Sequence, residues 1–155
     1  MNSPASASPL PSAGRSLRIL YAEDMPQLRE LMSVALAGEG HHIETVSDGA
    51  EALERLTKSH PAFDLLITDH HMPVMNGLEL VRQLRLLPFP GKIIVFSSEL
   101  SQAVHDKYRQ LVVDLILPKP IFPLTLRRML EQLFATGGPE AGRQRRDSRS
   151  PHACD

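Results

Sequence analysis

Four short runs of mainly apolar residues constrain the fold of this 155-residue chain more than any other feature. Each run is three to five residues long, which is too short for a helix and typical of a strand that is covered on both faces. A fifth segment, Ile43–Val46, mixes apolar and polar residues instead of being continuously apolar, and it favours a strand at the edge of the sheet. The four runs are Leu17–Tyr21, Leu65–Ile67, Ile93–Phe96 and Leu115–Leu117.

The segments that follow these predicted strands show the spacing of apolar residues that is typical of helices. Apolar residues recur there every three or four positions, as on the buried face of a helix. Asp48 with Glu51, and Asn76 with Glu79, have the spacing of a capping box and predict where two of the helices begin. The stripe of apolar residues on such a face is thinnest around Ser101–Gln110, so this helix is the least clearly indicated. The five stripes run from Leu28 to Leu36, from Ala52 to Leu56, from Leu80 to Leu87, from Leu100 to Leu111 and from Leu126 to Phe134.

Strand and helix alternate five times. Because the connections between parallel strands are right-handed, this alternation predicts a single architecture. It is an α/β fold in which a doubly wound, five-stranded parallel sheet carries helices on both faces. In such a sheet, ligands bind outside the carboxyl ends of the strands. The residues that follow each strand are therefore the candidates for a functional site.

Composition separates this fold from two tails. Residues 1–14 are mostly Ser, Pro and Ala, and residues 136–155 are rich in Gly, Arg and Ser. Neither segment can bury enough apolar surface to offset the entropy of ordering. We expect both to be disordered and residues 15–135 to form one domain. The four arginines between 143 and 149 are interspersed with acidic residues, which favours a solvated tail over a binding surface.

The net charge of −1 argues against a dedicated nucleic-acid-binding protein, because such proteins carry an excess of basic residues. No apolar run approaches the roughly 20 residues that span a bilayer. The N-terminal residues lack the pattern of a secretory signal, and the only cysteine, Cys154, cannot form an internal disulfide. These features predict a cytoplasmic location.

Polar residues follow four of the five predicted strands. Because parallel strands end at one edge of the sheet, we expect three carboxylates, a hydroxyl and an ammonium in one pocket. Clustered carboxylates raise one another's pKa unless a cation joins them, and Mg²⁺ suits such oxygen ligands. Asp69 could then act as a nucleophile towards a phosphoryl group whose oxygens Lys119 and Ser97 bind. The residues at the strand ends are Glu23, Asp24, Asp69, Ser97, Ser98 and Lys119.

The segment TDHHMPVMNG around Asp69 resembles the phosphoacceptor loop of bacterial two-component response-regulator receiver domains. The acidic pair, the Ser97-Ser98 step and the Lys119-Pro120 dipeptide match in order and spacing over about residues 16–135. The resemblance is to stand-alone, chemotaxis-regulator-like members of this family. It implies a flavodoxin-like (βα)5 fold with strand order 2-1-3-4-5.

The family resemblance also implies a role for each matching residue. Asp69 would accept a phosphoryl group from a histidine kinase or a histidine phosphotransfer protein. Lys119 would contact the acyl phosphate, Ser97 would close on it, and the Lys119–Pro120 peptide would be cis. The ligands of Mg²⁺ would be Glu23, Asp24, Asp69 and the backbone carbonyl of His71.

Three residues depart from the family pattern. Ile116 stands three positions before the lysine, where an aromatic residue often reports the switch. His71 stands two positions after the acceptor, where side chains influence the lifetime of the phosphoryl group. Pro118 stiffens the end of the last strand and has no evident role.

The resemblance predicts a single-domain response regulator, because no DNA-binding or enzymatic domain follows residue 135. Its output would be a protein-binding surface at about residues 99–135 that changes on phosphorylation and binds a target protein or a second copy of the chain. Its chemistry would be limited to its own phosphotransfer and dephosphorylation. The alternatives are an adaptor that keeps the fold without phosphorylation, and a hydrolase, for which His71 is the only candidate second acid.

Several of these residues have plainer interpretations. Asp24 is also a suitable N-cap for the helix that Pro26 begins, and this is compatible with metal binding. The pairs His41-His42 and His70-His71 lack the ligand spacing of a zinc site, because adjacent side chains on an extended chain point to opposite sides. An exposed loop is the favoured interpretation. We expect Tyr108 to be a half-buried helix residue.

Overall fold

The computed structural model describes residues 15–58, 62–98 and 101–135. They form five alternating strands and helices in the predicted order. The two segments that we expect to be disordered, and Cys154, lie outside the described residues. The elements are β1 (Arg18–Ala22), α1 (Pro26–Gly38), β2 (His42–Val46), α2 (Gly49–Lys58), β3 (Leu65–Asp69), α3 (Gly77–Arg85), β4 (Lys92–Ser97), α4 (Gln102–Gln110), β5 (Leu115–Pro118) and α5 (Pro123–Leu133).

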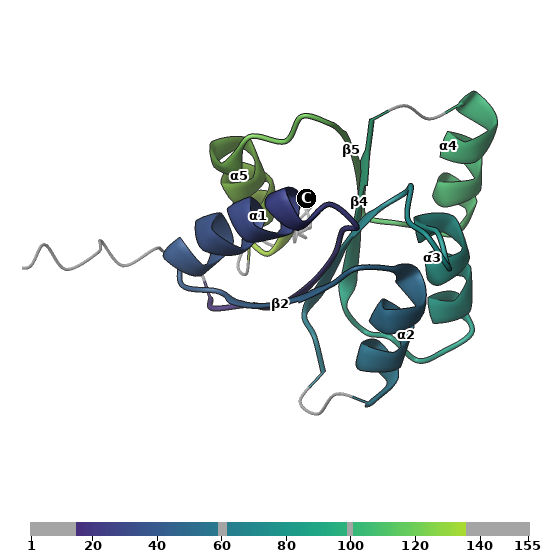
Figure 1. Ribbon diagram of the computed structural model, residues 1–155, viewed down its shortest axis with the longest axis horizontal. Helices are drawn as coiled ribbons and strands as arrows, with labels where there is room; N and C mark the ends of the chain where they lie inside the picture. Colours follow the sequence, from purple (N-terminus) through teal and green to yellow (C-terminus); the bar gives the residue numbers. More distant parts are fainter. Residues whose placement is uncertain (1–14, 59–61, 99–100, 136–155) are drawn as a thin grey trace, which may run out of the picture.

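The five strands form one parallel sheet in the order β2-β1-β3-β4-β5. Helices α1 and α5 cover one face of the sheet, and α2, α3 and α4 cover the other (Figure 1). This is the flavodoxin-like arrangement, so the predicted fold class is confirmed. The strand order reverses between β1 and β3, and the carboxyl ends of these two strands therefore flank the expected ligand site.

The core consists of two apolar layers, one on each face of the sheet. Every residue of β3 is buried, as the apolar run Leu65–Ile67 predicts for a central strand, and the polar Thr68 and Asp69 at its end are buried as well. Strand β5 is different, because only Leu117 is buried among its four residues. Its position at the edge of the sheet explains this exposure.

The predicted helix starts are largely correct. The Asn76 side chain accepts a hydrogen bond from the Glu79 amide (2.9 Å) at the start of α3, and the Asp48 side chain accepts one from the Glu51 amide (2.9 Å) beside α2. Two positions of the apolar stripes are wrong. Leu31 is 57% exposed, and Leu87 is 41% exposed beyond the end of α3. Periodicity thus identifies the helices but overestimates the width of their buried faces.

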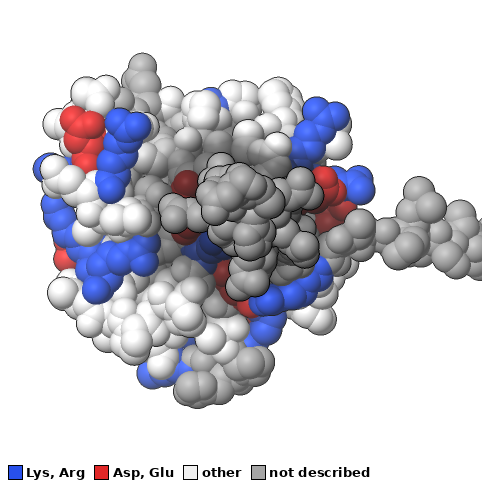
Figure 2. Space-filling model, turned by 180° about the vertical axis from the view of Figure 1, so that it is seen from behind, with Lys and Arg blue, Asp and Glu red and all other residues white. Residues whose placement is uncertain are grey.

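No helix among the described residues is long and apolar enough to cross a membrane. On the face in Figure 2, outside the grey area, basic and acidic side chains lie next to one another. A continuous basic surface is what a nucleic acid binds. The described residues visible on this face do not form one.

Gly77 begins α3 at a point of very close approach between backbone segments. A Cβ atom at this position would lie 2.4 Å from the carbonyl oxygen of Asp69 and 2.9 Å from the hydroxyl of Tyr108. The Gly77 amide donates a hydrogen bond to the His70 carbonyl (2.9 Å). The missing side chain therefore allows α3 to pack directly against the end of β3.

We predict that Gly77→Ala destabilises the fold by about 1–3 kcal/mol, because the added methyl group forces backbone apart in a packed region. Urea unfolding measures this difference. The matched control is Gly38→Ala at the end of α1, where an added Cβ has no atom within 4 Å. An equal effect of the two substitutions would show that the close approach does not contribute to stability.

His41 holds the start of β1 against the segment before β2. Its Nδ1 accepts a hydrogen bond from the Leu17 amide (3.1 Å), and the side chain is partly buried, contrary to the exposed loop that we predicted. Burial lowers the pKa of His41, and the Glu39 carboxylate opposes this shift. The folded state therefore favours the neutral ring that can accept the Leu17 amide.

This pKa shift predicts how stability depends on pH. The unfolded chain binds a proton at His41 more readily than the folded chain, so the free energy of unfolding should decrease as pH falls below the ordinary histidine value of 6.5. His41→Asn keeps an acceptor but does not titrate, and it should flatten this dependence in urea unfolding between about pH 7 and 5. His42→Asn, at an exposed position, should not. Identical pH profiles for the two variants would refute this role.

Candidate functional site

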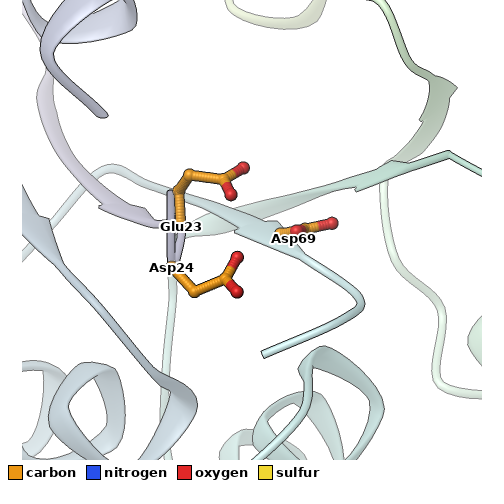
Figure 3. A group of neighbouring side chains, drawn as sticks. All are labelled: Glu23, Asp24 and Asp69. Carbon is orange, nitrogen blue, oxygen red and sulfur yellow. The ribbon is translucent and has the colours of Figure 1, made fainter. Parts of the chain in front are cut away.

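Three acidic residues meet at the carboxyl ends of β1 and β3. Glu23 and Asp24 follow β1, and Asp69 ends β3. One carboxylate oxygen of each lies within 4.8 Å of the others, and the three side chains surround one space (Figure 3). Glu23 and Asp69 are buried, at 0% and 4% exposure, whereas Asp24 is exposed. The structure thus brings together the three carboxylates that the sequence predicts to be neighbours.

Lys119 reaches this cluster from the loop after β5. Its Nζ lies 2.8 Å from Glu23 Oε2 and 3.2 Å from Asp69 Oδ2. The Lys119 amide donates to the Ser97 carbonyl (2.6 Å), and the Lys119–Pro120 peptide is cis, as expected. One ammonium therefore contacts both buried carboxylates, which leaves exposed Asp24 outside this set of ion pairs.

The pocket changes the proton affinity of its charged groups. Burial raises the pKa of Glu23, although hydrogen bonds from Lys119 and from the Met25 amide favour the carboxylate. Burial opposes the charged form of Lys119, but the hydrogen bond to Glu23 and the charge of Asp69 outweigh it and raise the Lys119 pKa. Lys119 is therefore an ammonium at neutral pH, and it is the cation that compensates the buried carboxylates.

Two further residues hold Glu23 in place, and the sequence analysis missed both. The Tyr21 hydroxyl donates to Glu23 Oε2 (3.3 Å), and burial followed by the charge of Glu23 raises the Tyr21 pKa. The Arg29 guanidinium donates to the backbone carbonyls of Glu23 (2.7 Å) and Asp24 (3.0 Å). Arg29 lies one turn into α1, so its spacing from the acidic pair was a usable signal. No sequence signal distinguishes Tyr21 from an ordinary core residue.

The structure does not support a capping role for Asp24. The N-cap of α1 is Met25, and no side chain accepts a hydrogen bond there. Instead, the Met25 amide donates to Glu23 Oε1 (3.1 Å). The side chain of Asp24 is therefore available at the mouth of the acidic cluster (Figure 3).

Ser97 ends β4 beside Lys119 and is 4% exposed. Its hydroxyl has no hydrogen-bond partner among the described residues. Buried hydroxyls are usually paired, so such a group is expected where another molecule supplies the partner. Ser98, the next residue, is small and exposed. Of the two serines, Ser97 is therefore the one whose hydroxyl is buried and has no hydrogen-bond partner among the described residues.

The two histidines after Asp69 differ in their surroundings. His70 is only 8% exposed, so the prediction of an exposed loop is wrong for this residue, whereas His71 is exposed. The His70 Nδ1 and the Tyr108 hydroxyl are 2.6 Å apart and share a hydrogen bond. Tyr108 is fully buried rather than half-buried. Their 38-residue separation in sequence explains why no local pattern indicated this pair.

The sequence model of the response regulator receiver domain family matches residues 19–131. The chain belongs to this family. Receiver domains are phosphoacceptor domains of two-component signalling, not classical enzymes, and they bind Mg²⁺ in an acidic pocket and interact with histidine kinases or phosphotransfer proteins. The acidic cluster of this receiver domain lies where that pocket is expected.

Known proteins of the same family include whole regulators and parts of sensors. Response regulator MprA of Mycobacterium leprae is 35% identical over 119 residues, covering 77% of this chain and 48% of MprA. Sensor protein EvgS of Escherichia coli is 34% identical over 117 residues, covering 76% of this chain and 10% of EvgS. The chain therefore spans half or less of the length of these two relatives.

Solved structures support the same fold. The chemotaxis response regulator CheY4 of Vibrio cholerae is 30% identical, with a TM-score of 0.70 over 77% of this chain and 99% of that chain. The receiver domain of sensor histidine kinase PA1611 from Pseudomonas aeruginosa has a TM-score of 0.70 at 22% identity, over 79% of this chain and 100% of its own. That structure is described with a magnesium ion coordinated in its active-site cleft.

We predict that Mg²⁺ stabilises this receiver domain and that Asp24 is needed for the effect. A ligand at ten times its Kd adds about 1.4 kcal/mol to the free energy of unfolding. Asp24→Asn should lose most of this gain in urea unfolding with and without Mg²⁺, because it removes an accessible carboxylate oxygen. Glu30→Gln, the same charge change at an exposed position of α1, should keep it. An equal gain in both variants would place Mg²⁺ elsewhere.

Proposed function

We propose that this receiver domain accepts a phosphoryl group on Asp69 from a histidine kinase or a histidine phosphotransfer protein, in a Mg²⁺-dependent reaction. One observation carries the proposal. The Asp69 carboxylate lies beside two further carboxylates and within 3.2 Å of an ammonium, at the switch point of the sheet. This combination supplies a nucleophile together with groups that compensate the charge of a phosphate.

In the proposed reaction, an Asp69 oxygen forms a bond to phosphorus while the bond between phosphorus and the donor breaks. The donor atom keeps that electron pair, and the product is an acyl phosphate on Asp69. Lys119 is already in contact with Asp69 and would move its hydrogen bond to a phosphoryl oxygen. Glu23, Asp24, Asp69 and the His71 carbonyl would hold Mg²⁺, which supplies charge neutralisation at the transferred group.

The unpaired Ser97 hydroxyl supports this proposal. It is buried beside Lys119, and a phosphoryl oxygen on Asp69 would give it the acceptor that the described residues do not provide. Donation from Ser97 would draw the end of β4 towards the acceptor. The phosphorylated state would then differ from the free state in the segment that follows β4.

We propose that this difference is read at the surface formed by α4, β5 and α5, about residues 99–135. The partner there is a downstream protein or a second copy of the chain. The cytoplasmic location that we expect suits a protein that receives phosphoryl groups from a kinase. Dephosphorylation by its own pocket, at a rate that the exposed His71 side chain influences, completes the proposed cycle.

The test is the intact mass of the protein after incubation with acetyl phosphate and Mg²⁺. We predict a single phosphoryl adduct that requires Mg²⁺, is removed by hydroxylamine and is absent from Asp69→Ala. Asp64→Ala is the matched control for the loss of a carboxylate, because Asp64 lies just before β3, at the end opposite Asp69. It should still form the adduct.

Three other results of this experiment would contradict the proposal. An adduct on Asp69→Ala would place the acceptor on another residue. No adduct with acetyl phosphate or with a phosphorylated histidine phosphotransfer protein, while Mg²⁺ still stabilises the fold, would refute the phosphoacceptor role and favour an adaptor. Continuous release of phosphate from a small phosphate ester would instead favour a hydrolase.

A further inference from the structure

The hydrogen bond between His70 and Tyr108 has no part in the proposed chemistry, yet it begins one residue after the acceptor. The Tyr108 hydroxyl and the His70 Nδ1 are 2.6 Å apart, and the ring centroids are 5.5 Å apart with an interplanar angle of 78°. Tyr108 is 0% exposed and His70 is 8% exposed. This contact therefore joins the acceptor loop to α4 inside the core.

The backbone of His70, just beyond the end of β3, makes hydrogen bonds to both β4 and α3. Its amide donates to the Phe96 carbonyl (3.1 Å), and its carbonyl accepts from the Gly77 amide (2.9 Å). The side chain is then the third attachment, directed at α4. Because Asp69 and His71 flank His70, a change in the position of the acceptor loop must move this side chain or strain its bonds.

Tyr108 is equally fixed at the other end. It lies two residues before the end of α4 and packs in the apolar layer that α2, α3 and α4 form against the sheet. The position of Gly77 leaves room for the hydroxyl, since a Cβ atom there would lie 2.9 Å from it. A displacement of His70 would therefore act on the C-terminal half of α4, which belongs to the proposed output surface.

The aromatic switch that the family resemblance implies has no aromatic side chain at its position in this chain. Ile116, at the position where this family often has an aromatic residue, packs partly buried against the same apolar layer. Its side chain has no polar atom and cannot exchange a hydrogen bond when Ser97 moves. Tyr108 is the aromatic hydroxyl of α4, and it already contacts the acceptor loop.

We propose that the Tyr108–His70 hydrogen bond is the positioning link through which phosphorylation of Asp69 changes α4. The link rests on the proposed function, because it transmits the phosphorylated state of that site. In the free protein it holds the last turns of α4 against the acceptor loop. In the phosphorylated protein the displaced loop weakens or redirects the bond, so that α4 and the surface around it change together.

Because both partners are buried, the loss of this single hydrogen bond has a large free-energy cost. Removing one partner of a buried pair leaves the other without a partner, at a cost larger than the net value of an exposed hydrogen bond. Burial, followed by the charge of Asp69, raises the pKa of Tyr108, so its hydroxyl remains a donor at neutral pH. Because an unpaired buried hydroxyl is costly, a displaced acceptor loop would favour a position of α4 in which the Tyr108 hydroxyl regains a hydrogen-bond partner.

The test compares hydrogen exchange of residues 102–110 before and after phosphorylation, at equal adduct occupancy by intact mass. In the wild-type chain we expect phosphorylation to change the exchange rates of α4. Tyr108→Phe should still form the adduct, and the change in α4 should shrink roughly two- to tenfold, the range of one hydrogen bond. Val104→Ala, on the same helix and against the same apolar layer, should raise basal exchange without shrinking the change.

A double-mutant cycle separates the link from general loosening of α4. His70→Leu and Tyr108→Phe remove the two ends of one bond, so the double variant should lose little more of the response than either single variant. Independent, additive losses would overturn the link, as would a full-sized change in Tyr108→Phe. The absence of any adduct on the wild-type chain would overturn the proposed function, and the link with it.

Discussion

The contact of one ammonium with two buried carboxylates is the interaction on which the rest of the site depends. Glu23 and Asp69 are nearly inaccessible, and two negative charges held close together away from water repel each other. The Lys119 ammonium, 96 residues away from Glu23 in the sequence, contacts both carboxylates and offsets part of this cost. The sheet must therefore place β1, β3 and the end of β5 around one pocket, and only the complete fold can form this site.

Much of this arrangement could be predicted because it follows from local patterns and one rule of topology. Apolar runs such as Leu65–Ile67 identified buried strands, and a parallel sheet brings the residues after each strand together. Asp69, Glu23 and Lys119 were therefore predicted as neighbours before any distance was known. The switch point between β1 and β3 explains why the acidic residues gather there rather than at another pair of strands.

The remaining features depend on contacts between distant segments, which a local pattern does not contain. Met25, rather than Asp24, is the N-cap of α1, because the position of the Glu23 carboxylate decides where the Met25 amide donates. His70 resembles an exposed loop residue in sequence and is buried only because Gly77 and Tyr108 approach it from other elements. The exposed Leu31 shows the converse, since an apolar residue on a helix is buried only where a partner covers it.

Asp69 consequently lies between two polar connections that lead to different parts of the fold. Lys119 links the carboxylate itself to β5, and His70 links the next residue to α4. A covalent change at Asp69 alters the first connection directly, because the ammonium must share its hydrogen bonds with new oxygens. It alters the second only through the backbone. The Lys119 contact would therefore respond more strongly to phosphorylation than the His70 contact, and α4 would move relative to β5. A binding surface changes shape when its elements move relative to one another, whereas a shift of all of them together leaves its shape unchanged.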